Sequence, residues 1–160
     1  MDFSNFFDYG AEAPVRATGA ALVFLPQLSS DEWDKLLSFS QRLTAKAGEV
    51  VVRQGESSRA FYIVASGQLE VVLKHPNGQE HVISEIAALS IFGEQAFFDG
   101  LPRSASVRAM AASEVYAISF DRFEVLAGHH PELARMALID LGRIVSLRLR
   151  EMNELVFKSR

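Results

Sequence analysis

The chain has 160 residues, a net charge of −4 and no cysteine. This length suits one domain, and a compact chain of this size buries roughly 70% of the surface that it exposes when unfolded. The composition therefore allows a hydrophobic core without a disulfide or a metal. The lack of cysteine excludes a disulfide scaffold, a thiolate zinc site and a cysteine nucleophile, and it fits a reducing compartment such as the cytoplasm.

Charge and hydropathy exclude further classes. A nucleic-acid-binding domain is usually basic, whereas this sequence is acidic, so we expect no nucleic acid partner. No stretch reaches the roughly 18 apolar residues of a membrane span, so we expect no membrane partner. The N-terminus has no basic segment ahead of an apolar run, which a signal peptide requires.

Residues 1–24 show little periodicity, and we expect an N-terminal extension, partly ordered, ahead of a domain spanning 25–160. The extension contains Phe3, Phe6, Phe7 and Tyr9. These aromatic side chains favour docking on the surface of the domain itself. The alternative is that they bind a partner or cover a ligand site.

A helix is predicted to begin at Ser29 or Ser30. Either serine can cap a helix, and Glu32 follows Ser29 by three residues, as in a capping box. Trp33, Leu36 and Leu37 then form one apolar face.

Between Gln41 and Ser119 the pattern changes to short apolar segments separated by turns. The predicted strands are Val50–Val52, Ala60–Ala65, Leu69–Leu73, Val82–Ile86, Ala105–Met110 and Val115–Ser119. Asn77-Gly78 predicts a hairpin between the third and fourth of these. Around eight short strands at this spacing imply a mainly β fold with flanking helices, an antiparallel β-roll or jelly-roll barrel.

Two helices are predicted at the C-terminal end. A short helix covers Phe120–Ala127 and is expected to end at Gly128. A long helix runs from Pro131 to about Phe157, since proline is well suited to the first helical position. Its apolar stripe consists of Leu138, Leu141, Val145, Met152 and Leu155. The helix is too long for a small barrel to cover, so part of this stripe predicts a homodimer through residues 131–157.

The segment FGEQAFFDGLPRSASVR, from Phe92 to Arg108, contains groups suited to a sugar phosphate. Gly93 allows close approach to its backbone, and the Glu94 carboxylate can accept from ribose hydroxyls. Residues 95–98 could form one helical turn, whose free N–H groups attract an anion. Arg103 offers a planar fork for phosphate oxygens, and Ser104 adds a hydroxyl. The alternative is an ordinary loop with a solvated Arg103.

The glycine, acid, proline and arginine of this segment stand at the spacing of a known cassette. The segment resembles the phosphate-binding cassette of cyclic nucleotide-binding domains, the family of the bacterial catabolite activator and the regulatory subunit of cAMP-dependent kinase. The spacing of Gly48 to Glu56 and the segment FYIVASG, from Phe61 to Gly67, are also similar to this family. The resemblance covers about residues 25–155.

The resemblance implies a role for each site residue. Glu94 would accept the ribose 2′-hydroxyl, and Arg103 would pair with the cyclic phosphate. The implied ligand-binding residues are Gly93, Glu94, Gln95, Ala96, Arg103, Ser104 and Ala105 in the cassette, Val71, Ile83 and Ile86 beside the base, and Arg148 on the long helix. The ligand is expected to be cAMP, with cGMP also compatible with Ser104.

The sequence departs from the family at three places. Arg59 stands two residues before the Phe-Tyr pair, where the family commonly has an acid that holds the cassette arginine. We expect Arg59 to turn toward solvent, or else to meet Asp99 or Glu56. Residues 88–91 are more apolar than in the family. Arg148 and Leu149 stand where the catabolite activator offers hydroxyls to adenine. Arg148 could contact the base, or be a solvated or dimer-interface charge.

Other functions can be weighed against this one. A cupin-type metal enzyme needs a close His-x-His pair with an acid, which the sequence lacks, so we expect no metal. No nucleophile elbow or P-loop is present, so we expect no enzyme. A degenerate family member acting only as an interaction module, and a cyclic di-GMP receptor, remain as alternatives. The chain stops after the long helix, so we expect a free-standing sensor without a DNA-binding module, which signals through helix movement to a separate protein partner.

Overall fold

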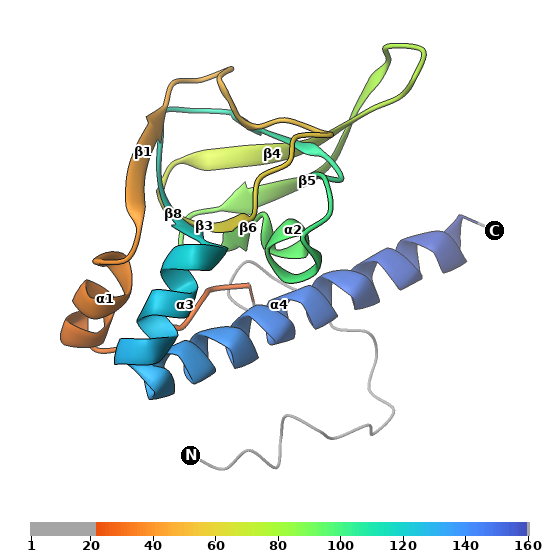
Figure 1. Cartoon of the computed structure of the whole chain (residues 1–160). Coiled ribbons are helices and arrows are strands. Elements are labelled where there is room, and N and C mark those ends of the chain that lie inside the picture. The colour runs from red at the N-terminus through yellow and green to blue at the C-terminus, as the bar shows by residue number, and fades with distance from the viewer. Residues whose placement is uncertain (1–21, 160) are drawn as a thin grey trace.

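The computed structural model describes residues 22–159. Eight strands and four helices lie within them (Figure 1). The strands are β1 (Gln41–Ala45), β2 (Val50–Val52), β3 (Ala60–Ser66), β4 (Gln68–Lys74), β5 (Glu80–Ala87), β6 (Ile91–Phe92), β7 (Ser106–Ala109) and β8 (Ser113–Ser119). The helices are α1 (Ser30–Leu37), α2 (Glu94–Asp99), α3 (Phe120–His129) and α4 (Pro131–Lys158).

The strands form two antiparallel sheets, in the orders β1-β8-β3-β6 and β2-β7-β4-β5. Their facing sides enclose a core that includes Val64, Leu69, Ile86 and Val115. The predicted β-roll with flanking helices is confirmed. The pair Ile91–Phe92, for which no strand was predicted, forms β6 and completes the first sheet beside Tyr62 and Ile63.

The helices lie together below the strands, and α4 runs along the whole underside of the molecule past α2 (Figure 1). They share a second core with one side of β3, formed around Phe61, Phe97, Phe123 and Leu141. Phe61 contacts Phe97 edge-to-face, with ring centroids 4.9 Å apart. This core therefore joins the strands, the cassette helix α2 and the C-terminal helices in one packed unit.

Most predicted helix boundaries agree with the structure. The capping box at α1 is confirmed, with the Ser29 hydroxyl accepting from the Glu32 amide. The prediction that Gly128 ends α3 is wrong, since the helix continues to His129. Leu141, one residue of the predicted apolar stripe, is fully buried in the core of the domain.

The start of the described chain is tied to α4. Phe24 is 1% exposed and packs on Phe61 and Trp33, although the sequence analysis placed it in the N-terminal extension. The Leu25 amide donates to Asp140, and Arg143 donates to the Val23 carbonyl. The aromatic residues at positions 3, 6, 7 and 9 lie outside the described residues.

Candidate phosphate and ribose site

The predicted cassette connects β6 to β7. Gly93 is in the left-handed region, at φ +79°, and leads directly into α2, which confirms the helical turn expected after it. The first backbone hydrogen bond of α2 runs from the Phe97 amide to the Gly93 carbonyl, at 3.3 Å. The amides of Glu94, Gln95 and Ala96 precede this bond, as the first N–H groups of a helix do.

Arg103 is the most firmly held residue of the cassette. Its backbone amide donates to the Glu56 carbonyl, and its own carbonyl accepts from the Gly55 amide. Its guanidinium donates to the Ser58 hydroxyl at 3.0 Å, the Gly93 carbonyl at 2.8 Å and the Ala60 carbonyl at 2.9 Å. Residues 53–60 therefore hold both the backbone and the side chain of Arg103.

The charge of Arg103 has no carboxylate partner among residues 22–159. The residue is 4% exposed, and its three hydrogen-bond acceptors are neutral oxygens. A guanidinium has five N–H groups, so three bonds leave two for an anion. A buried cation is costly without a counter-charge, so the site is chemically suited to a phosphate.

Tyr62 forms a wall beside this arginine. Its ring is stacked on Phe92, with centroids 4.7 Å apart, and the guanidinium carbon of Arg103 lies 5.6 Å from the ring centroid. Burial raises the pKa of the Tyr62 phenol, and the positive charge of Arg103 opposes that rise. The phenol therefore stays protonated and neutral near pH 7.

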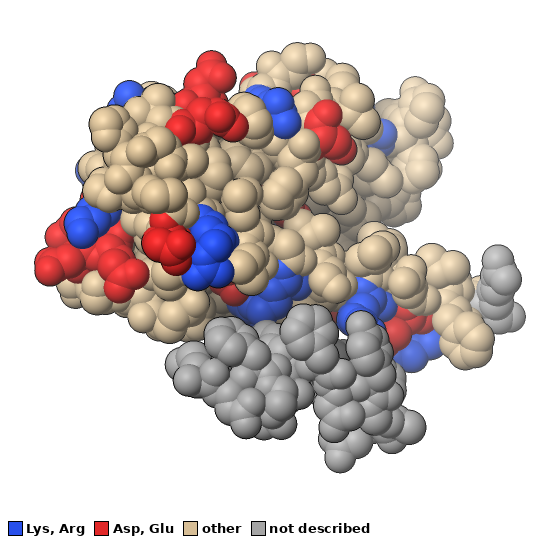
Figure 2. All heavy atoms as spheres, turned by 60° about the horizontal axis from the view of Figure 1, so that its bottom comes forward, with Lys and Arg blue, Asp and Glu red and all other residues tan. Residues whose placement is uncertain are grey.

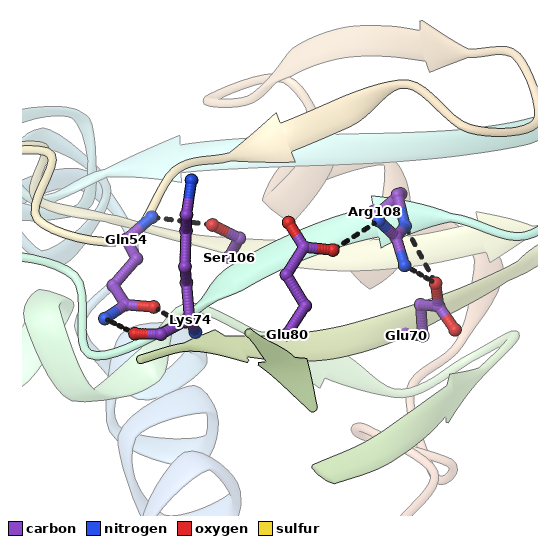
Figure 3. Close-up of polar contacts among 6 residues, drawn as sticks. All are labelled: Gln54, Glu70, Lys74, Glu80, Ser106 and Arg108. Carbon is purple, nitrogen blue, oxygen red and sulfur yellow. Dashed lines mark hydrogen bonds and ion pairs between the residues drawn. The ribbon is translucent and has the colours of Figure 1, made fainter. Parts of the chain in front are cut away.

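A polar network supports the turn that holds Arg103 (Figure 3). The side chain of Gln54 exchanges two hydrogen bonds with the backbone of Lys74 on β4. The backbone amide of Gln54 donates to the Ser106 hydroxyl on β7. Farther along the same sheet, Arg108 pairs with Glu70 and Glu80. Gln54 thus anchors the 53–56 turn to two strands, and this turn carries the backbone partners of Arg103.

Glu94 forms an ion pair with Arg148 of the long helix α4. The carboxylate is 7% exposed, and its Oε1 lies 2.8 Å from Nη1 of Arg148. Nη2 of Arg148 also donates to the Ile91 carbonyl at 2.5 Å and contacts the Ser90 hydroxyl at 3.4 Å. In this structure the half-buried Arg148 therefore binds the start of the cassette.

The other cassette residues lie close to these two. The Ser104 hydroxyl donates to the side chain of Gln95 at 2.7 Å, so the structure joins two of the predicted ligand-binding residues across the cassette. Ala96 is buried, whereas Gln95 and Ser104 are exposed and Ala105 is half-buried.

The residues predicted beside the base differ in how far they are buried. Ile86 is buried in the core between the sheets, and Val71 packs against that core. Ile83 is 46% exposed. The register of β4 and β5 shifts by one residue, so that Ser84, and not Ile83, is paired with Val71.

Arg59 does not turn freely into solvent and does not bond to Asp99 or Glu56. Its side chain donates to the carbonyls of Phe97 and Phe98 at the end of α2, at 2.8 and 3.1 Å. Its guanidinium carbon lies 3.5 Å from the centre of the Phe120 ring. The expected orientation was wrong because the free carbonyls of a short helix and an aromatic face are both good partners for a cation.

Three site features could not be found from the sequence. These are the Arg148–Glu94 pair and the two contacts of Arg103 with Ser58 and Ala60. All join segments at least 43 residues apart. The only sequence signal was the unusual presence of an arginine at position 148 within an apolar stripe.

Metal and membrane features can be considered for residues 22–159 alone. No group of three or more histidine, aspartate or glutamate side chains there is placed to hold a metal ion. No helix in that range is both long and apolar enough to cross a membrane. Two hollows of about 450 and 200 Å³ lie beside β1 and β2, and no cassette residue lines either of them.

Comparison with known proteins identifies relatives whose names refer to cAMP. The chain is 32% identical to a cyclic AMP receptor protein of Thermus thermophilus over 78% of its own length and 56% of the relative. It is 35% identical to a cAMP-dependent protein kinase regulatory subunit of Yarrowia lipolytica, over 65% of this chain and 27% of that protein. The chain thus spans little more than half of the first relative and about a quarter of the second.

A solved structure shares the fold. A cyclic nucleotide-binding domain from Methylobacillus flagellatus superimposes with a TM-score of 0.77 and 25% identity, over 89% of this chain and 80% of that one. Residues 42–130 match the family profile described as the cyclic nucleotide-binding domain. These residues contain the two sheets from β2 onward, the cassette and α3. The chain belongs to the cyclic nucleotide-binding domain family.

Proposed function

We propose that this protein is a non-catalytic sensor of a cyclic mononucleotide, with cAMP as the favoured ligand. The observation that carries the proposal is the buried, positively charged Arg103, whose hydrogen-bond partners are all neutral. A cyclic phosphate would supply the missing negative charge. The names of the Thermus and Yarrowia relatives, both of which refer to cAMP, support this choice of ligand.

Each cassette residue then has a task. The phosphate would bind Arg103, with help from the Ser104 hydroxyl and the amides of Gln95 and Ala96. The ribose 2′-hydroxyl would donate to Glu94, whose carboxylate is already buried and held in place. Val71 would offer apolar surface to the base, and Ile86, which is 3% exposed, would support that surface from the core. Ile83 would have to move to join them.

Ligand binding would be signalled by a change in the arrangement of the helices. The cassette helix α2 packs on α3 through Phe97 and Phe123, and it is linked to α4 through Glu94 and Arg148. A ligand that binds two arrangements of these helices unequally shifts the equilibrium between them. We infer that α3 and α4 transmit this shift to a separate protein partner or to a second copy of the chain, in the cytoplasm.

Calorimetry with cAMP, cGMP and cyclic di-GMP tests the proposal. Arg103→Ala should weaken binding of the preferred mononucleotide by about 2–5 kcal/mol, because it leaves a desolvated phosphate without its partner. Arg122→Ala is the control, since this exposed arginine of α3 lies outside the cassette.

The alternatives give different results. Tighter binding of cyclic di-GMP than of either mononucleotide would make the chain a receptor for the dinucleotide. No binding of any of the three would leave an interaction module that has kept only the fold. Equal affinities of wild type and Arg103→Ala would contradict the assignment of the phosphate site.

A further inference from the structure

We propose that Arg148 is a positioning residue, which holds the Glu94 carboxylate in the orientation that accepts the ribose 2′-hydroxyl. This inference rests on the proposed function. It departs from the expectation for this position, since the residue would act on the ribose through Glu94 and would not read the base.

The contacts of Arg148 are all with the cassette entrance. One terminal nitrogen of its guanidinium binds Oε1 of Glu94, and the other binds the Ile91 carbonyl and the Ser90 hydroxyl. Ser90 and Ile91 are buried, and they immediately precede Phe92 and Gly93. Arg148 therefore fixes the carboxylate relative to the backbone that leads into α2.

The carboxylate needs such a partner. Glu94 is 7% exposed, and a buried carboxylate without a partner is strongly disfavoured. The guanidinium of Arg148 supplies this partner through a charge-assisted hydrogen bond of 2.8 Å to Oε1. Arg148 engages Oε1 only, and an ionised carboxylate has lone pairs on both oxygens. Oε2 is thus able to accept from a hydroxyl while the ion pair persists.

The pair also connects distant parts of the fold. Glu94 is the first residue of α2, and Arg148 lies 54 residues later, past the middle of α4. The C-terminal end of α4 lies beyond α2, at the opposite end of the helix from α3 (Figure 1). A ligand that uses Glu94 therefore acts on a group bonded directly to this helix.

The test is a cycle of two proteins and two ligands, measured by calorimetry. Wild type and Arg148→Gln are titrated with cAMP and with 2′-deoxy-cAMP, and with the corresponding guanine pair if cGMP binds more tightly. We expect Arg148→Gln to weaken cAMP binding about tenfold, as for loss of a charge-assisted hydrogen bond, and to change 2′-deoxy-cAMP binding less than about twofold. Arg148→Lys keeps the charge and should fall between wild type and Arg148→Gln with cAMP.

Arg150→Gln is the matched control, because it removes the same charge from an exposed position two residues away. It should bind both ligands as wild type does. Thermal unfolding of each variant shows that it is folded before titration.

The possible outcomes separate the two proposals. Equal losses for cAMP and 2′-deoxy-cAMP, no loss for either, or tighter cAMP binding by Arg148→Gln would each overturn the positioning role while leaving the sensor function intact. Failure of wild type to bind any cyclic nucleotide would overturn both.

Discussion

Gly93 and Arg103 show how single residues define this site. A Cβ atom at Gly93 would lie 2.8 Å from Nη1 of Arg103 and 3.0 Å from the Ala60 carbonyl oxygen. The glycine therefore leaves room for the arginine of the protein itself, in addition to any ligand. Its φ of +79° is a second reason why a side chain is disfavoured there.

A comparison of Gly93→Ala with Gly48→Ala separates the effect of the positive φ from the effect of the close neighbours. Gly48 has a similar φ of +87°, but nothing lies within 4 Å of the position that its Cβ would occupy. We expect Gly48→Ala to lower the free energy of unfolding by about 1 kcal/mol from backbone strain alone. Gly93→Ala should cost more, about 2–4 kcal/mol, because Arg103 and Ala60 must also shift.

Urea denaturation provides the measurement, and calorimetry with cAMP adds a second reading. Only Gly93→Ala should weaken ligand binding, since it displaces Arg103. Equal stability losses in the two variants would mean that the close approach of Arg103 contributes nothing.

At the level of secondary-structure elements, Arg59 links the cassette helix to the next helix of the chain. Its side chain binds the last carbonyls of α2 and stacks on Phe120, the first residue of α3. Its backbone carbonyl accepts from the Phe120 amide at 2.9 Å. The arginine that replaces the expected acid thus connects α2 to α3 instead of holding Arg103, and neutral carbonyls take over that task.

Arg59→Met tests this link, because methionine keeps an unbranched side chain but has no charge or N–H donors. Loss of a cation at a helix end and of one cation–π contact should lower the free energy of unfolding by about 1 kcal/mol. Amide hydrogen exchange should speed up at the end of α2 and the start of α3. Arg59→Lys retains the charge and should lose less.

Hydrogen exchange with and without cAMP gives the functional reading of the same variants. A change in α3 protection on ligand binding should be smaller in Arg59→Met than in wild type. If both proteins show the same change in α3, the coupling between α2 and α3 does not pass through Arg59.

For the molecule as a whole, α4 carries several large apolar side chains that are exposed to solvent. Leu138, Leu149, Met152 and Val156 are all at least 41% exposed, and their spacing of eleven, three and four residues is that of a coiled-coil seam. On the face seen in Figure 2, acidic and basic groups are scattered with uncharged surface between them and form no single basic field. This pattern fits a protein partner, and a second copy presents the same complementary seam.

Leu149→Asp should convert such a dimer to a monomer, because each seam would then bury two like charges. Size-exclusion chromatography with light scattering gives the mass directly. Val125→Asp is the control, since Val125 is an exposed apolar residue of α3 outside the seam. A wild-type protein that is monomeric at high micromolar concentration would contradict the dimer through residues 131–157.

Local features of this protein could be predicted from its sequence. Turn residues, alternation and capping residues act between near neighbours, so they predicted the capping box and six of the eight strands, all except β1 and β6. The spacing of glycine, glutamate and arginine indicated the cassette. Features that depend on groups distant in the chain were missed. The β4–β5 bulge pairs Val71 with Ser84 and leaves Ile83 46% exposed, and only the packed fold shows which part of the α4 stripe is buried.

The pairing of the charges depends on the packing of distant segments. Arg59, Arg103 and Arg148 each have several possible partners in sequence, and an arginine side chain reaches far enough to take any of them. Packing of α4 against the cassette brings Arg148 to Glu94, and the 53–60 segment surrounds Arg103 with neutral oxygens. The sequence thus named the residues of the site, while the fold decided which of them are paired with each other and which retains a charge for a ligand.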